Sequence, residues 1–276
     1  MPIELLASWV ESGKMTLRML NPLLFLFLTF SGGITLLADA PEIKQGTVDP
    51  GVWLLYQRAL NQDAEAQYEL AWLYVDGERG LPRDDGAAFH WFNESALAGY
   101  GPSFIEVGYC YSQGVGVEQN VQEAYDWYIK SADEGDAIAM SDLGYMYAAG
   151  KLGQIDFKSA SDWFHRALIG ENILARNNAA WYFATVEDKR HVRGKYAVEI
   201  MIGVVKEDPH HNFFDTFAAA LAANGQFGNA QQAQKQAIRQ ANLLAEYDVI
   251  EGYNERLVLY ENRQRFIYYG VDGVTE

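Results

Sequence analysis

The sequence contains a single cysteine, Cys110, and few basic residues. One cysteine excludes an intramolecular disulfide framework and any zinc site built from several cysteines. Lysine and arginine total 21 against 37 aspartates and glutamates, which gives a formal net charge of -16. Because nucleic acids and anionic lipids are bound by lysine and arginine, this charge argues against both as partners. With 49% hydrophobic residues among 276, the chain is nevertheless one that folds.

Charged side chains are also missing from residues 19–38, which form one long apolar stretch. It is followed by an Ala-x-Ala motif that ends at Ala40, the form of a signal-peptide cleavage site. Residues 1–14 carry two glutamates, which suit the start of a signal peptide poorly, so Met15 reads better as the first residue. We expect residues 1–40 to be a signal peptide and the mature chain to be periplasmic. The alternative is an uncleaved segment that anchors the chain in the inner membrane.

The remaining chain repeats itself, and tryptophans mark the period. Each of three aromatic pairs begins with a tryptophan, the tryptophans lie 36 residues apart, and an alanine precedes each by three positions. The pairs are Trp91-Phe92, Trp127-Tyr128 and Trp163-Phe164. Before each pair comes a motif in which an apolar residue, a small residue and a tyrosine share one helical face. Its three copies are Leu70-Ala71-Trp72-Leu73-Tyr74, Val107-Gly108-Tyr109-Cys110-Tyr111 and Leu143-Gly144-Tyr145-Met146-Tyr147.

Each unit therefore predicts two helices joined by a loop. The first helix would end at a left-handed glycine and the second would begin at an aspartate or asparagine cap. These positions are Gly77, Gly114 and Gly150, then Asp84, Asn120 and Asp156. A hairpin this short cannot bury its own apolar face, so neighbouring hairpins must stack. The fold class is thus all-α, a right-handed α-solenoid of stacked helical hairpins.

These motifs resemble the Sel-1-like repeat, a member of the tetratricopeptide-repeat superfamily. The second unit carries almost the whole pattern, from Val107-Gly108-Tyr109 through the loop Gly114-Val115-Gly116-Val117 to Trp127-Tyr128. The resemblance implies three Sel-1-like repeats over residues 64–172 and two tetratricopeptide-like repeats over residues 173–247. A linker and capping helix would occupy residues 41–63, and a C-terminal capping helix and tail residues 248–276.

One further position carries an aromatic residue in four consecutive repeats. We call these residues the aromatic row: Trp72, Tyr109, Tyr145 and Trp181. In tetratricopeptide geometry this position of the first helix faces the concave groove, which implies a binding surface for an extended segment. Tyr68, Ile105 and Asn177 lie one helical turn earlier on the same face, with Asn177 a candidate hydrogen-bonding clamp. The competing interpretation is that these rings pack between adjacent first helices.

Residues suited to catalysis or metal binding are few. His90 and His165 lie beside the repeat tryptophans at positions that vary between repeats, which is typical of solvated helix surface. His210-His211 would need two further ligands to hold a metal ion. Cys110 lies inside a first helix, where a buried hydrophobic role is expected. We therefore expect no catalytic residue, no cofactor and no metal site.

The sequence thus predicts a non-enzymatic scaffold or adaptor of the periplasm or cell envelope. It would bind a protein or peptide segment in the concave groove, and the mature chain would bind neither nucleic acid nor membrane. The alternative is a cell-wall-binding module or hydrolase acting on peptidoglycan or β-lactams. Some exported members of the resembled family are associated with penicillin binding, but they are rich in cysteine pairs, which this chain lacks.

Overall fold

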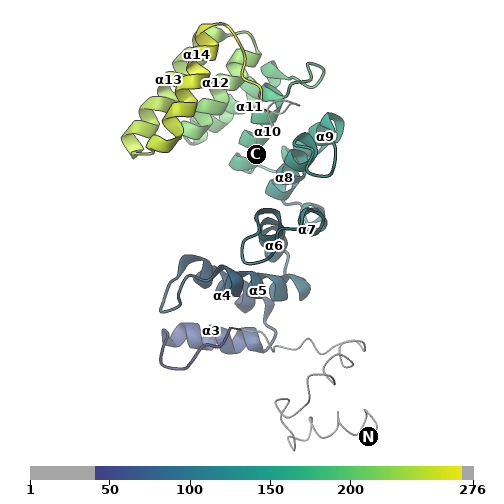
Figure 1. Ribbon diagram of the computed structural model, residues 1–276, viewed down its shortest axis with the longest axis vertical. Helices are drawn as coiled ribbons and strands as arrows, with labels where there is room; N and C mark the ends of the chain where they lie inside the picture. The colour runs from purple at the N-terminus through teal and green to yellow at the C-terminus, as the bar shows by residue number, and fades with distance from the viewer. Residues whose placement is uncertain (1–40, 269–276) are drawn as a thin grey trace, which may run out of the picture. The chain divides into compact units, whose positions relative to one another are not determined.

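The computed structural model describes residues 41–268, with helices labelled as in Figure 1. Within this range the chain forms twelve α-helices and one 3-10 helix. They are α3 (Pro50–Leu60), α4 (Ala64–Asp76), α5 (Asp85–Leu97), α6 (Pro102–Gln113), α7 (Val121–Asp133), α8 (Ala137–Ala148), α9 (Phe157–Ala167), α10 (Ile173–Thr185), α11 (Gly194–Glu207), α12 (His211–Ala223), α13 (Phe227–Leu244), η3 (Tyr247–Val249) and α14 (Ile250–Glu261). The all-α prediction is confirmed. The expected signal peptide lies outside the described residues.

The helices pack as hairpins in the order of the chain. The five hairpins are α4–α5, α6–α7, α8–α9, α10–α11 and α12–α13, and each contacts the next one (Figure 1). Helix α3 packs on α4 at one end, and α14 packs on α13 at the other. This consecutive packing confirms the predicted α-solenoid. Among the described residues, no helix combines the length and the hydropathy needed to cross a membrane.

Local sequence signals define where the repeat helices begin and end. Asp84 caps α5, Asn120 caps α7 and Asp156 caps α9, in each case by accepting hydrogen bonds from backbone N–H groups of the first turn. Gly77 and Gly114 end the first helices in the left-handed conformation, at φ 67° and 72°. These residues supply partners for helix-end groups that would otherwise lack them, so the hairpin boundaries follow directly from the sequence motifs.

Close packing inside a hairpin depends on the small residue of the repeat motif. A Cβ atom at Gly108 would lie 2.6 Å from the ring of Tyr128, and one at Gly144 would lie 2.9 Å from the ring of Phe164. Phe164 is 1% exposed and stacks on Tyr182 at a centroid distance of 4.6 Å, so its ring has little room to move. In these two repeats the second residue of the aromatic pair therefore packs directly on the glycine face of the first helix.

Replacing Gly144 by alanine tests this packing. The new methyl group would overlap the ring of Phe164, and overpacking of this kind costs about 1–3 kcal/mol. Gly203 in α11 is the matched control, because the nearest atom to its Cβ would be 3.8 Å away on the flexible side chain of Arg176. There alanine is the better helix former and stabilises by about 0.5–1 kcal/mol. Urea denaturation measures both changes; a Gly144→Ala variant as stable as the wild type would contradict the packing argument.

Candidate binding surface

The aromatic row occupies the same place on four first helices. Trp72 lies on α4, Tyr109 on α6, Tyr145 on α8 and Trp181 on α10. Tyr109 is 51% exposed, Tyr145 37% and Trp72 36%, whereas Trp181 is half-buried. Three of the four rings therefore present area to solvent, which a purely internal packing role does not require. Their role in binding stays a prediction.

At the N-terminal end, the row is partly built into an aromatic cluster. The ring of Trp72 meets that of Phe92 edge to face at 5.5 Å and that of Tyr68 at 6.3 Å. Tyr68 also contacts Phe92 and Tyr100, and burial raises its pKa. Ile105 is half-buried and packs against the core cluster that contains Leu143. Tyr68 and Ile105 thus take part in packing within the repeats, and their part in binding stays a prediction, while Trp72 keeps 36% of its surface exposed.

At the C-terminal end, the chain covers its own aromatic row. The rings of Phe266 and Tyr268 lie 5.7 and 5.9 Å from that of Trp181. The backbone N–H of Tyr268 donates to the carbonyl oxygen of Thr185 at 3.0 Å, and Arg265 donates to the carbonyl oxygen of Val186 at 2.9 Å. Trp181, predicted as an open contact, is instead covered, because the segment after α14 turns back onto the end of α10.

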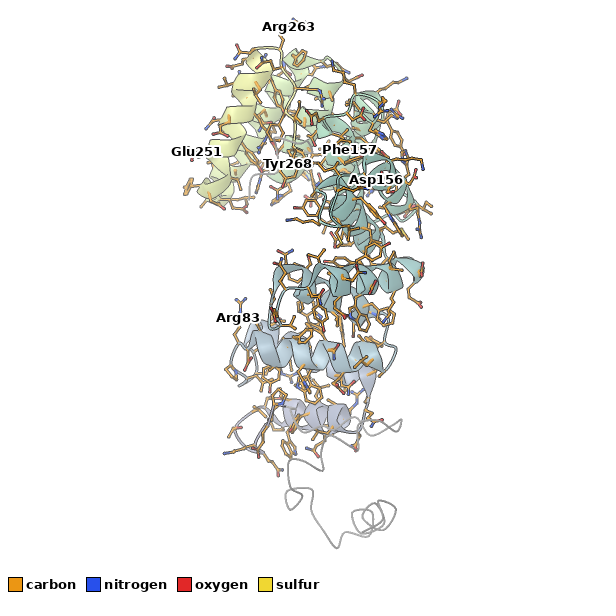
Figure 2. The ribbon with its side chains drawn as sticks, turned by 45° about the vertical axis from the view of Figure 1, so that its right-hand side comes forward. Arg83, Asp156, Phe157, Glu251, Arg263 and Tyr268 are labelled. Carbon is orange, nitrogen blue, oxygen red and sulfur yellow. The ribbon has the colours of Figure 1, made fainter. Side chains whose placement is uncertain are left out.

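The segment that covers Trp181, residues 264–268, packs against a charged side chain that is itself held in place. Arg256 of α14 places its guanidinium 5.2 Å from the ring centroid of Phe266 and 5.7 Å from that of Trp181. Its Nε atom donates to the carboxylate of Asp215 in α12 at 2.8 Å, and Asp215 is only 7% exposed. Because this cation is held by a buried carboxylate, it offers both rings a fixed charge. Figure 2 shows Tyr268 between the C-terminal helices and the α8–α9 hairpin.

Next to this segment, a cleft of about 400 Å³ opens between α8 and α10. We call it the α8–α10 cleft; its lining residues are Ser141, Asp142, Tyr145, Phe164, Asn178, Trp181 and Tyr268. The Nδ2 atom of Asn178 donates to the hydroxyl of Ser141 at 3.2 Å, which joins the two first helices across its floor. The cleft therefore brings together two members of the aromatic row, a carboxylate and an amide.

Asn177 does not line this cleft, contrary to its predicted role as a clamp. Its Oδ1 atom is buried and makes no hydrogen bond within the described residues. Asn178 lines the cleft instead, because one residue along a helix turns the side chain by about 100°. The part of Asn177 in binding stays a prediction, and in this cleft the amide is that of Asn178.

Acidic residues, which the sequence motif did not single out, lie beside the aromatic row. Glu69, Glu106 and Asp142 each precede a member of the row by three residues, and Asn178 holds the corresponding place in α10. Burial, with the nearby charge of Asp136, raises the pKa of Glu106 to about 7 and that of Asp142 to about 7. The recurrence three residues before the row, on the same helical face, is the signal that could have revealed them.

The nucleophilic side chains of the repeats serve internal structure. Cys110 is buried, and burial raises the pKa of its thiol to about 12, which disfavours the reactive thiolate. The hydroxyl of Ser161 is 2.8 Å from Nδ1 of His191 and 3.0 Å from the hydroxyl of Tyr182. Since Tyr182 in turn donates to the carbonyl oxygen of Phe157, these groups connect α9, α10 and the following loop.

Comparison with known families matches the three N-terminal hairpins. Residues 64–100, 105–136 and 137–168 each match the Sel1 repeat. The chain contains three Sel1 repeats. This confirms the resemblance seen in the motifs, and each match covers one of the hairpins α4–α5, α6–α7 and α8–α9. The fold is typical of protein–protein interaction scaffolds, and the family is generally non-catalytic.

Two solved structures are similar to this chain, and the first supports the fold. A Sel1 repeat protein from Oxalobacter formigenes is 19% identical and superposes with a TM-score of 0.54, over 75% of this chain and 98% of that one. The protein c5321, described as a protective antigen of uropathogenic Escherichia coli with an SLR fold, is 20% identical, with a TM-score of 0.39 over 78% of this chain and 56% of its own. No match was found among curated protein sequences.

Replacing Phe266 by alanine should release the C-terminal segment of this protein. The change removes the ring contacts with Trp181 and Arg256, while the helices keep their own cores. We expect faster hydrogen exchange at the backbone N–H of Tyr268, which otherwise donates to Thr185, and unchanged far-ultraviolet circular dichroism. Ile267→Ala is the matched control, because the Ile267 side chain is 43% exposed. Equal exchange in the wild type and Phe266→Ala would show that the ring contacts do not hold the segment.

The raised pKa of Glu106 predicts a pH dependence of stability. A folded-state pKa of about 7 lies above the ordinary value of a glutamate, so folding favours the protonated form. The stabilisation is fully present below that ordinary value and is lost as pH rises through about 7. The urea midpoint of the wild type should therefore rise between pH 8 and pH 5 by more than that of Glu106→Gln, which lacks the carboxyl group at this position. Glu78→Gln, at an exposed loop position, should follow the wild type; an identical pH profile for Glu106→Gln would contradict the burial effect.

Proposed function

We propose that this protein is a non-enzymatic scaffold of the periplasm or cell envelope, which binds an extended segment of a partner protein along the first helices of its repeats. The Sel1 repeats support the general role as an interaction scaffold. Export is supported by the apolar stretch and the Ala-x-Ala motif before residue 41. The assignment of the surface rests on the aromatic row and the α8–α10 cleft.

The observation that carries this proposal is the segment lying on Trp181. Residues 264–268 lie against α10 without helical structure, place two aromatic rings on a member of the row and hydrogen-bond to carbonyl groups at the end of that helix. The chain thus contains an internal example of how a first helix of this fold holds an extended peptide. Tyr109 and Tyr145 occupy the equivalent place on α6 and α8 and remain exposed.

The chemistry of the surface favours a partner segment with basic and aromatic side chains. Aromatic rings of the row offer stacking and cation–π contacts of about 0.5–1.5 kcal/mol each. Glu69, Glu106 and Asp142 add carboxylates beside the row, and the chain as a whole carries a net charge of -16. A partner cation stabilises the ionised form of Glu106 and Asp142, so partner affinity should decrease as pH falls below about 7.

Affinity capture from a cell-envelope extract tests the surface. We expect the double variant Tyr109→Ala, Tyr145→Ala to retain at least tenfold less partner than the wild type, because two exposed rings of the row are lost. The matched control is Leu243→Ala on α13, a side chain that is 79% exposed outside the row. Capture should be unchanged in the control, and both proteins should melt within a few degrees of the wild type.

Three results would contradict the proposal. Equal capture by the double variant and the wild type would show that the row is not the binding surface. Sedimentation with purified cell-wall sacculi, unaffected by loss of both tyrosines, would favour the cell-wall alternative and place its site elsewhere. Capture that disappears together with a large drop in melting temperature would show that the two rings belong to the core, against their exposure.

A further inference from the structure

Two histidines and a glutamate meet near the C-terminal end of the solenoid, away from the aromatic row. His210 directly precedes α12 and His211 is the first residue of that helix, while Glu246 lies in the turn between α13 and η3. One side-chain nitrogen or oxygen from each of the three residues lies within 4.8 Å of the others. The preceding residue, Ala245, has a left-handed backbone at φ 60°, and it turns the chain after α13 so that Glu246 reaches α12.

Both ring nitrogens of His211 are engaged, and the hydrogen bonds fix their roles. The ring is fully buried; Nδ1 lies 2.7 Å from the hydroxyl of Tyr253, and Nε2 lies 2.7 Å from Oε2 of Glu246. Tyr253 donates its only hydroxyl proton to Oδ1 of Asn212 at 2.7 Å, so its oxygen accepts from the Nδ1–H of His211. In the neutral ring, Nε2 then carries a lone pair, which faces a carboxylate oxygen of Glu246. Two acceptors this close require a cation between them, either a proton or a metal ion.

The position of His210 favours the metal ion over the proton. A proton shared by His211 and Glu246 needs no third partner. The ring of His210 nevertheless lies 4.1 Å from that of His211, and one of its nitrogens is a possible metal ligand in the same cluster. Two imidazoles and a carboxylate are a ligand set typical of zinc and similar divalent ions. His211 also has the outer hydrogen bond through Nδ1 that orients metal-binding histidines.

We propose that His210, His211 and Glu246 form a binding site for a divalent transition-metal ion of the zinc type, with a fourth position open to water. Ligands of a tetrahedral zinc ion lie roughly 3.3 Å apart, given metal–ligand distances of about 2.0–2.1 Å. The Glu246 carboxylate therefore moves outward by about half an ångström on binding, which its 45% exposed side chain permits. His210 is half-buried, so the ion can enter from solvent.

The hydrogen bond between Nδ1 of His211 and the Tyr253 hydroxyl, at 2.7 Å, orients the other ring nitrogen toward Glu246. The ligands come from the start of α12 and from the turn that leads to α14. The ion would therefore link this turn to α12 and restrain α14, which carries Arg256 and precedes residues 264–268.

Titration of the tag-free full chain with Zn²⁺ alone, followed by calorimetry, tests the site. We expect one saturable site of micromolar or tighter affinity. His210→Ala and Glu246→Gln should each weaken it at least tenfold, and His165→Ala, an exposed histidine on α9, should leave it unchanged. Co²⁺ should give the visible absorption of a four-coordinate site in the wild type and in His165→Ala but not in the two ligand variants, and Mg²⁺, which prefers oxygen ligands, should not compete.

Both ligand variants change side chains that are not fully buried, so the fold is expected to survive, and melting without metal checks this. Saturating Zn²⁺ should raise the melting temperature of the wild type and of His165→Ala, but not of His210→Ala or Glu246→Gln. Zn²⁺ bound equally by all four proteins, or no saturable binding by the wild type, would overturn the proposal and leave a proton between His211 and Glu246. Failure of the site would leave the aromatic row untouched, since the two share no residue.

Discussion

The contact on which the rest of the structure depends is the close approach of two helices across a glycine. At Gly108 and Gly144 the missing side chain lets an aromatic ring of the second helix lie against the backbone of the first. This contact fixes how the first helix is rotated about its axis. The next residue along, about 100° further round, is turned away from the partner helix. Tyr109 and Tyr145 are exposed for this reason, and the aromatic row is a consequence of hairpin packing.

The same rotation brings carboxylates to a partly buried place beside the row. Burial shifts the pKa of Glu106 and of Asp142 to about 7, which means that folding leaves both groups where their ionised form is disfavoured. A fold optimised for stability alone would place a neutral amide there, as α10 does with Asn178. Placing a carboxylate where its ionised form is disfavoured is characteristic of surfaces that bind a ligand. A cationic side chain of a partner would stabilise the ionised form and remove this cost.

The C-terminal region ends the solenoid by a different kind of interaction. Asp215 holds Arg256, and the guanidinium of Arg256 faces Phe266 and Trp181, so a buried ion pair and a cluster of tilted rings replace the glycine contact of the repeats. A segment attached to the same chain is present at a high effective concentration, so weak contacts suffice to hold it. The cover over Trp181 thus limits the open part of the row to the Sel1 repeats.

The helices, their caps, the hairpin order and the position of the aromatic row could all be predicted from the sequence. Asp84, Asn120 and Gly114 act on residues within one helical turn, and the repeat unit of about 36 residues occurs three times, so short-range patterns determine them. The cover of Trp181, the α8–α10 cleft and the meeting of His211 with Glu246 could not be predicted. Arg265 and Val186 are 79 residues apart, and His211 and Glu246 are 35 apart. Such pairs meet only because the stacking of whole hairpins, and the turns after α13 and α14, bring distant segments together, and no local pattern encodes that distance.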